Sequence, residues 1–295
     1  MPEMMDDEPT KDAHQIGDLP RRSVAAGRGE RLRLLETAFT NWRVPGYVGS
    51  IAYRVRRFSP ALFDALMNLR FDMKTKDGTR LLARIRDLNG PAEVFGLDEY
   101  NLPWIDWMDI DYVIDIGAHV GSFTLWTAAR SRCKILALEP NPATRQLLES
   151  NVKNQKLQDR VIVRGWALAG GPGLRRLRPA PDSAASALVF EVAVGDLQVE
   201  AIDLAGAISA SEFPRLDLVK LDIEGAEYEV FHSAPVEILQ APRHWVVECH
   251  AAAGVSSEAI ETALTSAGFE VATIAKPQGQ KLLVARRQEG ISHQT

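Results

Sequence analysis

Cysteine is scarce in this chain of 295 residues, and so are the features that mark export or membrane insertion. The two cysteines, Cys133 and Cys249, lie in apolar runs without the spacing of a metal site or disulfide framework, so both should be reduced and buried. No apolar stretch approaches the roughly 20 residues that span a bilayer. The acidic first 20 residues lack the apolar core of a signal peptide. These absences favour a cytoplasmic protein.

An excess of positive charge is also missing. The net charge is −5, which gives no overall electrostatic reason to bind nucleic acid or an anionic membrane. Hydrophobic residues make up 46% of the chain, enough for one sizeable core and a smaller accessory part. We therefore expect no nucleic acid and no membrane as a partner. The sequence is also compatible with a homodimer.

The residue pattern divides the chain into tails at 1–28 and 289–295, an accessory region at 29–105 and a main domain at 106–288. In the accessory region, Ser59-Pro60 predicts a helix start, and Asp77-Gly78 predicts a two-residue hairpin turn. Nine arginines against two acids in residues 21–57 indicate either a solvated helix face or a docking surface for an acidic or phosphorylated partner.

From residue 112 onward, short apolar runs alternate with helical segments. This alternation predicts βαβ units, a mostly parallel sheet and helices on both of its faces. The last two runs, 269–274 and 281–287, are joined by six residues, too few for a crossover helix, so they should pair antiparallel. We expect a single strand over 160–168. Residues 170–187, rich in Gly, Pro, Ala and Ser, predict a long loop.

A glycine turn, "DIGAHVG", follows the first of these runs from Asp115 to Gly121. Its glycines allow a tight turn close to a ligand, and the next helix points free N–H groups at the same place. Glu139, which ends the second run, is placed to accept hydrogen bonds from a ribose. His119 replaces the middle glycine of an NAD-binding turn. The Asp115 carboxylate would repel a pyrophosphate but suits an ammonium group, so the pattern favours S-adenosylmethionine over NAD.

Four acids in "LDIEGAEYE" follow the apolar run 216–221. Strand alternation puts Asp222 and Glu224 on one side, and Glu248 and His250 end the next run with the same spacing. Carboxyl ends of neighbouring parallel strands border the ligand crevice. We therefore expect these four side chains to converge as catalytic residues, with His250 as a proton acceptor.

The same four side chains would also suit a hard metal ion, Mg²⁺ or Mn²⁺, which could bind vicinal hydroxyls of an acceptor. The other two acids of the segment, Glu227 and Glu229, fall in the first turn of the next helix. The helix dipole favours acids there, so we expect them to have structural or surface roles. Lys220 is expected to pair with an acid.

Four stretches together resemble the FkbM family of S-adenosylmethionine-dependent methyltransferases: "VIDIGAHVGSFT", "ALEPNP", "DLVKLDIEGAEYEVF" and "WVVECH". The resemblance implies an α/β, Rossmann-like class I methyltransferase fold of seven mostly parallel strands with an antiparallel C-terminal strand. It makes 106–288 the S-adenosylmethionine-binding domain. It also implies methyl transfer to a hydroxyl of a natural product, sugar or glycolipid.

The resemblance further assigns cofactor-binding positions. Those of the glycine turn are Asp115, Gly117, Ala118, His119, Val120 and Gly121. Glu139 would hold the ribose, with Pro140 and Asn141 beside it. Because "RGWALAGG" lacks the acid that class I enzymes often place near the adenine, either Trp166 or the backbone around Ala167 would cover the ring instead. Asp222 would border both the cofactor and the acceptor.

The sequence leaves two other classes of function open. An NAD-linked oxidoreductase on a similar sheet is disfavoured by His119. A catalytically silent S-adenosylmethionine-binding scaffold is disfavoured because acids at 222, 224 and 248 are costly to bury without a task or a partner.

Overall fold

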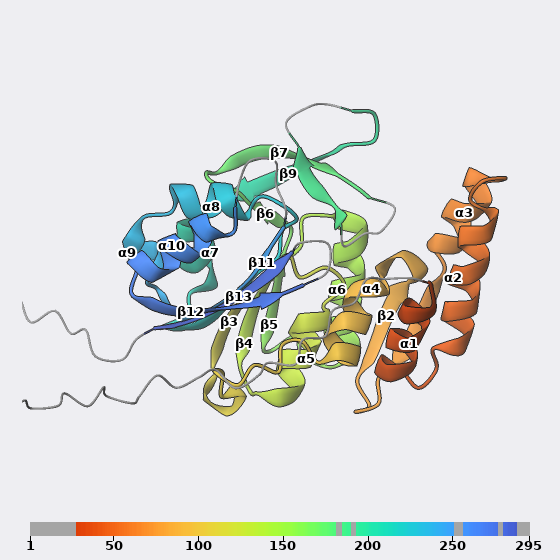
Figure 1. Ribbon diagram of the computed structural model, residues 1–295, viewed down its shortest axis with the longest axis horizontal. Helices are drawn as coiled ribbons and strands as arrows, with labels where there is room; N and C mark the ends of the chain where they lie inside the picture. Colours follow the sequence, from red (N-terminus) through yellow and green to blue (C-terminus); the bar gives the residue numbers. More distant parts are fainter. Residues whose placement is uncertain (1–27, 181–184, 190–192, 251–255, 277–279, 288–295) are drawn as a thin grey trace, which may run out of the picture.

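The computed structural model describes residues 28–180, 185–189, 193–250, 256–276 and 280–287 (Figure 1). The predicted tails therefore lie outside the described residues, except for residue 28. A seven-stranded sheet of order β12-β13-β11-β10-β3-β4-β5 forms the centre. Its strands are β3 (Tyr112–Ile116), β4 (Lys134–Leu138), β5 (Val161–Arg164), β10 (Leu216–Leu221), β11 (Pro242–Cys249), β12 (Phe269–Ala275) and β13 (Lys281–Arg287). Strand β13 pairs antiparallel with β11 and β12, and the other neighbours pair parallel, which confirms the predicted class I methyltransferase sheet.

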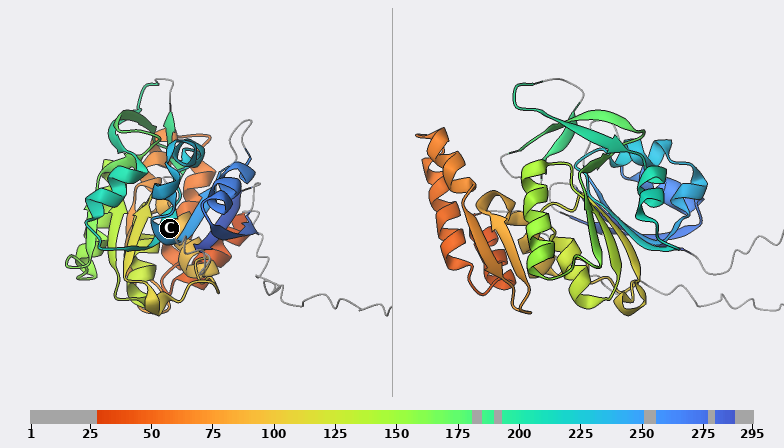
Figure 2. Two further views of the ribbon diagram at one scale, coloured as in Figure 1. Left: turned by 90° about the vertical axis from the view of Figure 1, so that its left-hand side faces the viewer. Right: turned by 180° about the vertical axis from the view of Figure 1, so that it is seen from behind.

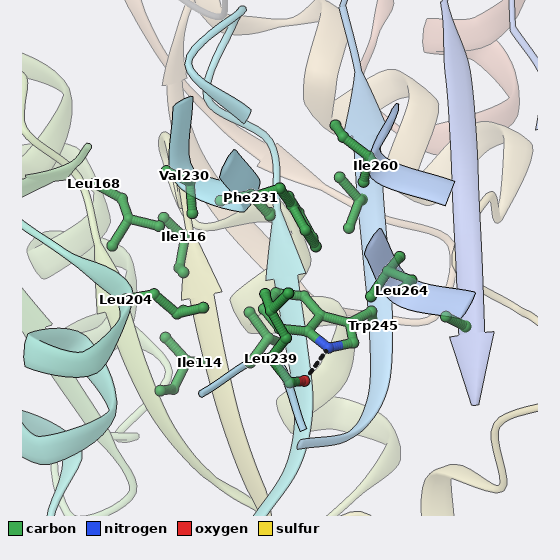
Figure 3. Packing of buried hydrophobic residues seen from close by; sticks show 14 of the residues in the cluster. Ile114, Ile116, Leu168, Leu204, Val230, Phe231, Leu239, Trp245, Ile260 and Leu264 are labelled. Carbon is green, nitrogen blue, oxygen red and sulfur yellow. Dashed lines mark hydrogen bonds between the residues drawn. The ribbon is translucent and has the colours of Figure 1, made fainter. Parts of the chain in front are cut away.

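Helices cover both faces of this sheet, and Figure 2 shows them on opposite sides of it. One face carries α7 (Leu204–Ser211), α8 (Glu227–Ser233), α9 (Val236–Leu239) and α10 (Glu258–Ser266); the other carries α5 (Ser122–Arg130) and α6 (Pro142–Asn154). Alternate residues of a strand point to opposite faces of the sheet and pack into different helix layers. Ile114 packs on the side of α7–α10, and Val113 packs on the side of α5 and α6. In the first layer, the buried Trp245 indole N–H donates to the Leu239 carbonyl at 3.0 Å (Figure 3).

A second, four-stranded sheet of order β6-β9-β7-β8 lies beyond the carboxyl ends of the main sheet (Figure 1). Its strands are β6 (Trp166–Leu168), β7 (Gly173–Arg178), β8 (Ala187–Val189) and β9 (Leu197–Ile202). The prediction of a long loop over 170–187 was therefore wrong for the residues that form β7. Residues 181–184 of that predicted loop lie outside the described residues. The predicted single strand over 160–168 was also wrong, because the chain leaves the main sheet at Gly165. A small core around Leu177 and Val199 holds the second sheet together.

The accessory region contains three helices, α1 (Arg28–Ala38), α2 (Arg43–Val55) and α3 (Pro60–Met67), and a hairpin of β1 (Arg70–Lys74) and β2 (Arg80–Arg84). Short helical turns follow as η1 (Ile85–Asp87), α4 (Asn89–Ala92), the π-helical η2 (Glu93–Leu97) and η3 (Trp107–Asp109). Ser59 caps α3 as predicted, since its hydroxyl accepts from the Leu62 N–H at 3.2 Å. The two-residue turn was wrong: the Thr75 N–H bonds the Thr79 carbonyl at 2.8 Å, which leaves three residues in the loop with Gly78 at φ +95°.

The accessory region and the main domain share one hydrophobic core, in which Met73 and Leu81 pack with Leu125 and Leu147. The buried side chain of Asn151, on α6, bonds the backbone of β2 in the way that a neighbouring strand would. Its side-chain oxygen accepts from the Leu82 N–H at 2.6 Å, and its side-chain nitrogen donates to the Leu82 carbonyl at 3.0 Å. The accessory hairpin is thereby fixed against the domain that carries the glycine turn.

Two predictions from the sequence concern the cysteines and membrane-spanning helices. Cys133 and Cys249 are buried and free, as the sequence predicts. Within the described part of the chain, the helices are all too short or too polar to cross a bilayer.

Candidate active site

A cavity of about 340 Å³ opens at the carboxyl ends of the main-sheet strands, between the second sheet and the accessory region. Most of the predicted site residues line it: Gly117, Ala118, His119, Glu139, Pro140, Trp166, Ala167, Asp222, Glu224, Glu248 and His250. The remaining four, Asp115, Val120, Gly121 and Asn141, are buried behind that wall.

The glycine turn has a backbone that other residues could hardly adopt. Gly117 has φ +75°, and a Cβ there would lie 1.8 Å from the Asp222 carbonyl oxygen, so only glycine fits between the two strand ends. His119 also has a positive φ, +53°. Its N–H donates to one Glu139 carboxylate oxygen at 2.9 Å, and the Asn141 N–H donates to the other at 2.8 Å. Glu139 therefore holds the turn in shape, while each oxygen keeps a further lone pair for a ligand.

Asp115 does not approach the cavity. Its carboxylate is fully buried, accepts from the Thr124 hydroxyl at 2.6 Å and lies 3.5 Å from the Lys220 ammonium. Asp115 Oδ1 is buried and has no hydrogen-bond partner among the described residues, although the Lys220 ammonium lies 3.5 Å from it. The predicted contact of this carboxylate with a cofactor ammonium group stays a prediction.

Lys220 links the glycine turn to the acidic segment. Its buried ammonium donates to the Gly117 carbonyl at 2.8 Å and lies 3.4 Å from an Asp222 carboxylate oxygen. Burial lowers the pKa of Lys220, but the charges of Asp222 and Asp115 raise it by more. The net effect is a raised pKa, so the side chain stays charged. The prediction that Lys220 pairs with an acid is confirmed.

The four predicted catalytic side chains converge because β10 and β11 are parallel neighbours. The Nε2 atom of His250 lies 3.4 Å from Glu224, 3.8 Å from Asp222 and 3.9 Å from Glu248. Glu224 has φ +57°, a left-handed conformation that costs a non-glycine residue about 1–3 kcal/mol. Such strain is typical of residues held in place for function.

Of the structural or surface role expected for Glu227, the structure shows the structural one, because its carboxylate holds the acidic turn and His250. It is fully buried and accepts from the Ile223 N–H at 3.1 Å, the Gly225 N–H at 2.9 Å and His250 Nδ1 at 2.9 Å. The contact leaves Nε2 facing the other acids. Burial lowers the pKa of His250, but the hydrogen bond to Glu227 and the charge of Asp222 raise it to about 9.

A signal for Glu227 was present in the sequence. It lies three and four residues before Val230 and Phe231, which are buried on the same face of α8. Glu229, on another face, is exposed, and its carboxylate accepts from the Gly170 N–H at 3.0 Å. The expected surface role holds for Glu229 alone.

Three further charged residues at the cavity had no sequence signal. The Lys276 ammonium lies 2.7 Å from Glu248 and 3.1 Å from Glu99. Glu93, on the π-helical η2, lines the same wall, and burial together with the charge of Glu99 raises its pKa to about 8. Burial also raises the pKa of Glu224 to about 8, although the charge of nearby His250 acts to lower it. The cavity is rich in carboxyl groups.

A metal-type arrangement exists within this cluster. One ligand atom each from Asp222, Glu224 and His250 lies within 4.8 Å of the others. Glu248, the fourth predicted ligand, is bonded to Lys276 instead.

Comparisons with known proteins agree on a family. The family model described as the methyltransferase FkbM domain matches residues 115–271. Hexuronic acid methyltransferase AglP of Haloferax volcanii is 26% identical over 210 residues, covering 70% of this chain and 80% of that protein. Methyltransferase sdnD of Sordaria araneosa is 25% identical over 213 residues, covering 60% and 82%.

A crystal structure of methyltransferase FkbM from Methylobacillus flagellatus aligns with a TM-score of 0.44 and 14% identity over 61% of this chain and 44% of that chain. The family match spans more than half of the chain and includes the glycine turn, Glu139 and the acidic cluster. This chain belongs to the FkbM methyltransferase family.

Proposed function

We propose that this chain is an S-adenosylmethionine-dependent O-methyltransferase that acts on a hydroxyl of a natural product, sugar or glycolipid. One observation carries the proposal. Asp222, Glu224, Glu248 and His250 converge in the same cavity as the glycine turn and Glu139. A methyl acceptor and a nucleoside cofactor can therefore meet there. The relative named for hexuronic acid supports an acceptor of the sugar type.

The cavity suits a cationic nucleoside. When bound, S-adenosylmethionine supplies an electrophilic methyl group on a sulfonium. Glu139 offers its free lone pairs to ribose hydroxyls, and Trp166 and Ala167 offer a wall for the adenine. The carboxylate of Asp222 favours positive charge nearby and disfavours the pyrophosphate of NAD.

His250 takes the proton of the acceptor hydroxyl through Nε2. Glu227 occupies Nδ1 at 2.9 Å, so that only Nε2 faces the acceptor. Asp222 and Glu224 accept hydrogen bonds from the acceptor and align its oxygen for in-line attack. Positive charge brought by the cofactor offsets the carboxylates that keep His250 protonated, which favours the neutral, proton-accepting imidazole.

A divalent cation is the second candidate for the same cluster, favoured by the 4.8 Å grouping of the Asp222, Glu224 and His250 ligand atoms. These residues would hold Mg²⁺ or Mn²⁺, which would lower the pKa of an acceptor hydroxyl. Unchanged turnover after treatment with a chelator would exclude this arrangement.

Calorimetry with S-adenosylmethionine, S-adenosylhomocysteine and NAD tests the cofactor, and transfer of labelled methyl to a panel of hydroxyl compounds tests the reaction. We expect Asp222→Asn and Glu224→Gln to lower turnover by about 100-fold or more. Glu229→Gln, an exposed acid of the same segment, is the matched control and should keep full turnover. Binding of NAD alone would refute the proposal, and tight cofactor binding without any turnover would favour a silent scaffold.

A further inference from the structure

The active-site cavity continues into the accessory region. Helices α1, α2 and α3 and the short turns η1 and α4 line this part, which we call the accessory arm. Its buried apolar side chains are Leu35, Met67, Ile85, Leu88 and Ala92. They belong to the core that the accessory region shares with the main domain. A cavity wall of this kind holds water poorly and accepts the apolar parts of a ligand.

The backbone of α2 forms another side of the accessory arm, at Gly46 and Gly49. A Cβ at Gly46 would lie 3.0 Å from Leu32 Cδ2, and one at Gly49 would lie 3.2 Å from Ile85 Cγ2. The two glycines therefore let α2 pack closely against α1 and η1. Ser50, on the same helix, donates its hydroxyl to the Gly46 carbonyl at 3.0 Å, so its proton is already used within the helix.

The residues proposed to hold the cofactor lie elsewhere on the cavity wall. Glu139 and Trp166 come from the main domain, and so does the glycine turn from Asp115 to Gly121. The proposed cofactor contacts thus leave the accessory arm to the acceptor.

Residues 85–99 join the accessory arm to the acidic cluster. At one end of this stretch, Ile85 lines the arm. At the other end, Glu99 lies 3.1 Å from Lys276, which in turn lies 2.7 Å from Glu248. All four side chains line the same cavity. One molecule can therefore place a hydroxyl at the cluster and an attached apolar group in the arm.

Arg86 brings a charge and a hydrogen-bond donor to the accessory arm. Its Nη2 lies 2.5 Å from Asp64, which is outside the cavity lining. Its Nε is buried and has no hydrogen-bond partner among the described residues. An ether or ester oxygen on an otherwise apolar group could accept from this N–H.

We infer that the acceptor is an amphiphile: its reacting hydroxyl meets the acidic cluster, and an apolar chain or ring attached to it occupies the accessory arm. The inference rests on the proposed function and narrows its acceptor to a glycolipid or an apolar natural product, which excludes a free sugar. Burying one methylene group strengthens binding about fourfold, so a chain of a few carbons in the arm has a measurable effect.

Three probes test this inference: 1-butanol, 1-hexanol and 1-octanol, which carry one hydroxyl each and differ only in chain length. Their affinities for the full chain in complex with S-adenosylhomocysteine are measured by ligand-observed NMR. We expect octanol to bind about 100-fold more tightly than butanol, with hexanol between them. A rise of less than about tenfold would overturn the inference. So would a failure of all three to bind, which is also the result expected if residues 1–27 fill the arm.

A side chain added at Gly90 supplies a second readout. Gly90, on α4, lines the cavity, and a Cβ there would meet His119 Nδ1 at 3.8 Å, with other described atoms outside its own helix more than 4 Å away. Gly90→Leu therefore extends into open space between the arm and the glycine turn. It should reduce the difference between butanol and octanol to about tenfold or less.

Gly171→Leu is the matched control. A Cβ at Gly171 would meet none of the described atoms within 4 Å, and the position lies outside the cavity lining, so the difference should stay unchanged. If Gly90→Leu does not fold or no longer binds S-adenosylhomocysteine, Ser50→Leu fills the arm from α2 instead. It should narrow the difference as well, and an unchanged difference would count against the inference.

The proposed function and the inference fail separately. If S-adenosylmethionine and S-adenosylhomocysteine do not bind, the proposed function is wrong. If they bind and the three alkanols are not distinguished by chain length, only the inference about the acceptor is wrong.

Discussion

Replacing Lys220 by methionine tests how the cofactor turn is held. Lys220→Met keeps an unbranched apolar side chain but removes the ammonium group that donates to the Gly117 carbonyl at 2.8 Å. It also leaves the fully buried Asp115 carboxylate without the cation that lies 3.5 Å away. The Thr124 hydroxyl remains as the neutral partner of that carboxylate.

Removing one partner of a buried ion pair costs about 3–5 kcal/mol, because the other charge stays buried. This is a large part of the roughly 5–15 kcal/mol that separates folded from unfolded protein. Adding Asp115→Asn removes the stranded charge as well. The double variant should therefore be more stable than Lys220→Met alone, with a coupling free energy of about 2 kcal/mol between the two positions.

Urea denaturation followed by circular dichroism measures these free energies of unfolding. Lys134→Met, at an exposed position of β4, is the control and should stay within about 0.5 kcal/mol of the wild type. Affinity for S-adenosylmethionine should also fall about tenfold, since the Gly117 carbonyl loses a charged donor. Wild-type stability of Lys220→Met, or a double variant no more stable than the single one, would refute this reasoning.

Three further variants test other buried contacts. Glu227→Gln should lower the pKa of His250 from about 9, since the charge of Glu227 contributes to raising it, and NMR titration of the imidazole in EDTA will show whether it does. Asn151→Leu should destabilise the protein by about 2–4 kcal/mol in thermal unfolding, because both backbone groups of Leu82 lose their partner. Burial raises the pKa of Asp87, but its hydrogen bonds and ion pairs lower it further, so its stabilising effect should be lost as the pH falls below about 4. Asp87→Asn should show a smaller acid-induced loss of stability, and an unchanged loss would contradict that assignment.

The main sheet and the convergence of four site residues could be predicted because both follow from local pattern. Apolar runs separated by helical segments allow few arrangements other than parallel βαβ units. In such a sheet, neighbouring strands end at the same edge. Asp222 and Glu248 therefore had to meet once their strands were adjacent, and His250 follows directly after β11. The strand alternation used in the prediction does not extend to Glu224, which lies in the turn after β10 with φ +57° and reaches the cluster through that turn.

The second sheet was missed because its core is small. Its strands bury a few alanines with Leu177 and Val199, while glycine and arginine dominate β7, so the pattern of a half-buried strand is weak. Glu93 and Lys276 were missed for another reason. They are 183 residues apart in the sequence and meet only through the tertiary fold, which no local periodicity reports.

The acidic cluster is held together by cations placed between its members. Lys276 lies between Glu99 and Glu248, and His250 between Glu227 and the acids at the end of β10. Carboxyl groups still outnumber these cations on the cavity wall. Burial and the charges of neighbouring acids raise the pKa of Glu93 to about 8 and that of Glu248 to about 7, so some repulsion remains in the unliganded protein. A cationic cofactor would relieve it, and any ligand that binds the folded state alone stabilises that state. S-adenosylmethionine should therefore raise the melting temperature more than S-adenosylhomocysteine, which lacks the sulfonium charge, and a larger rise with S-adenosylhomocysteine would show that the acids serve another ligand.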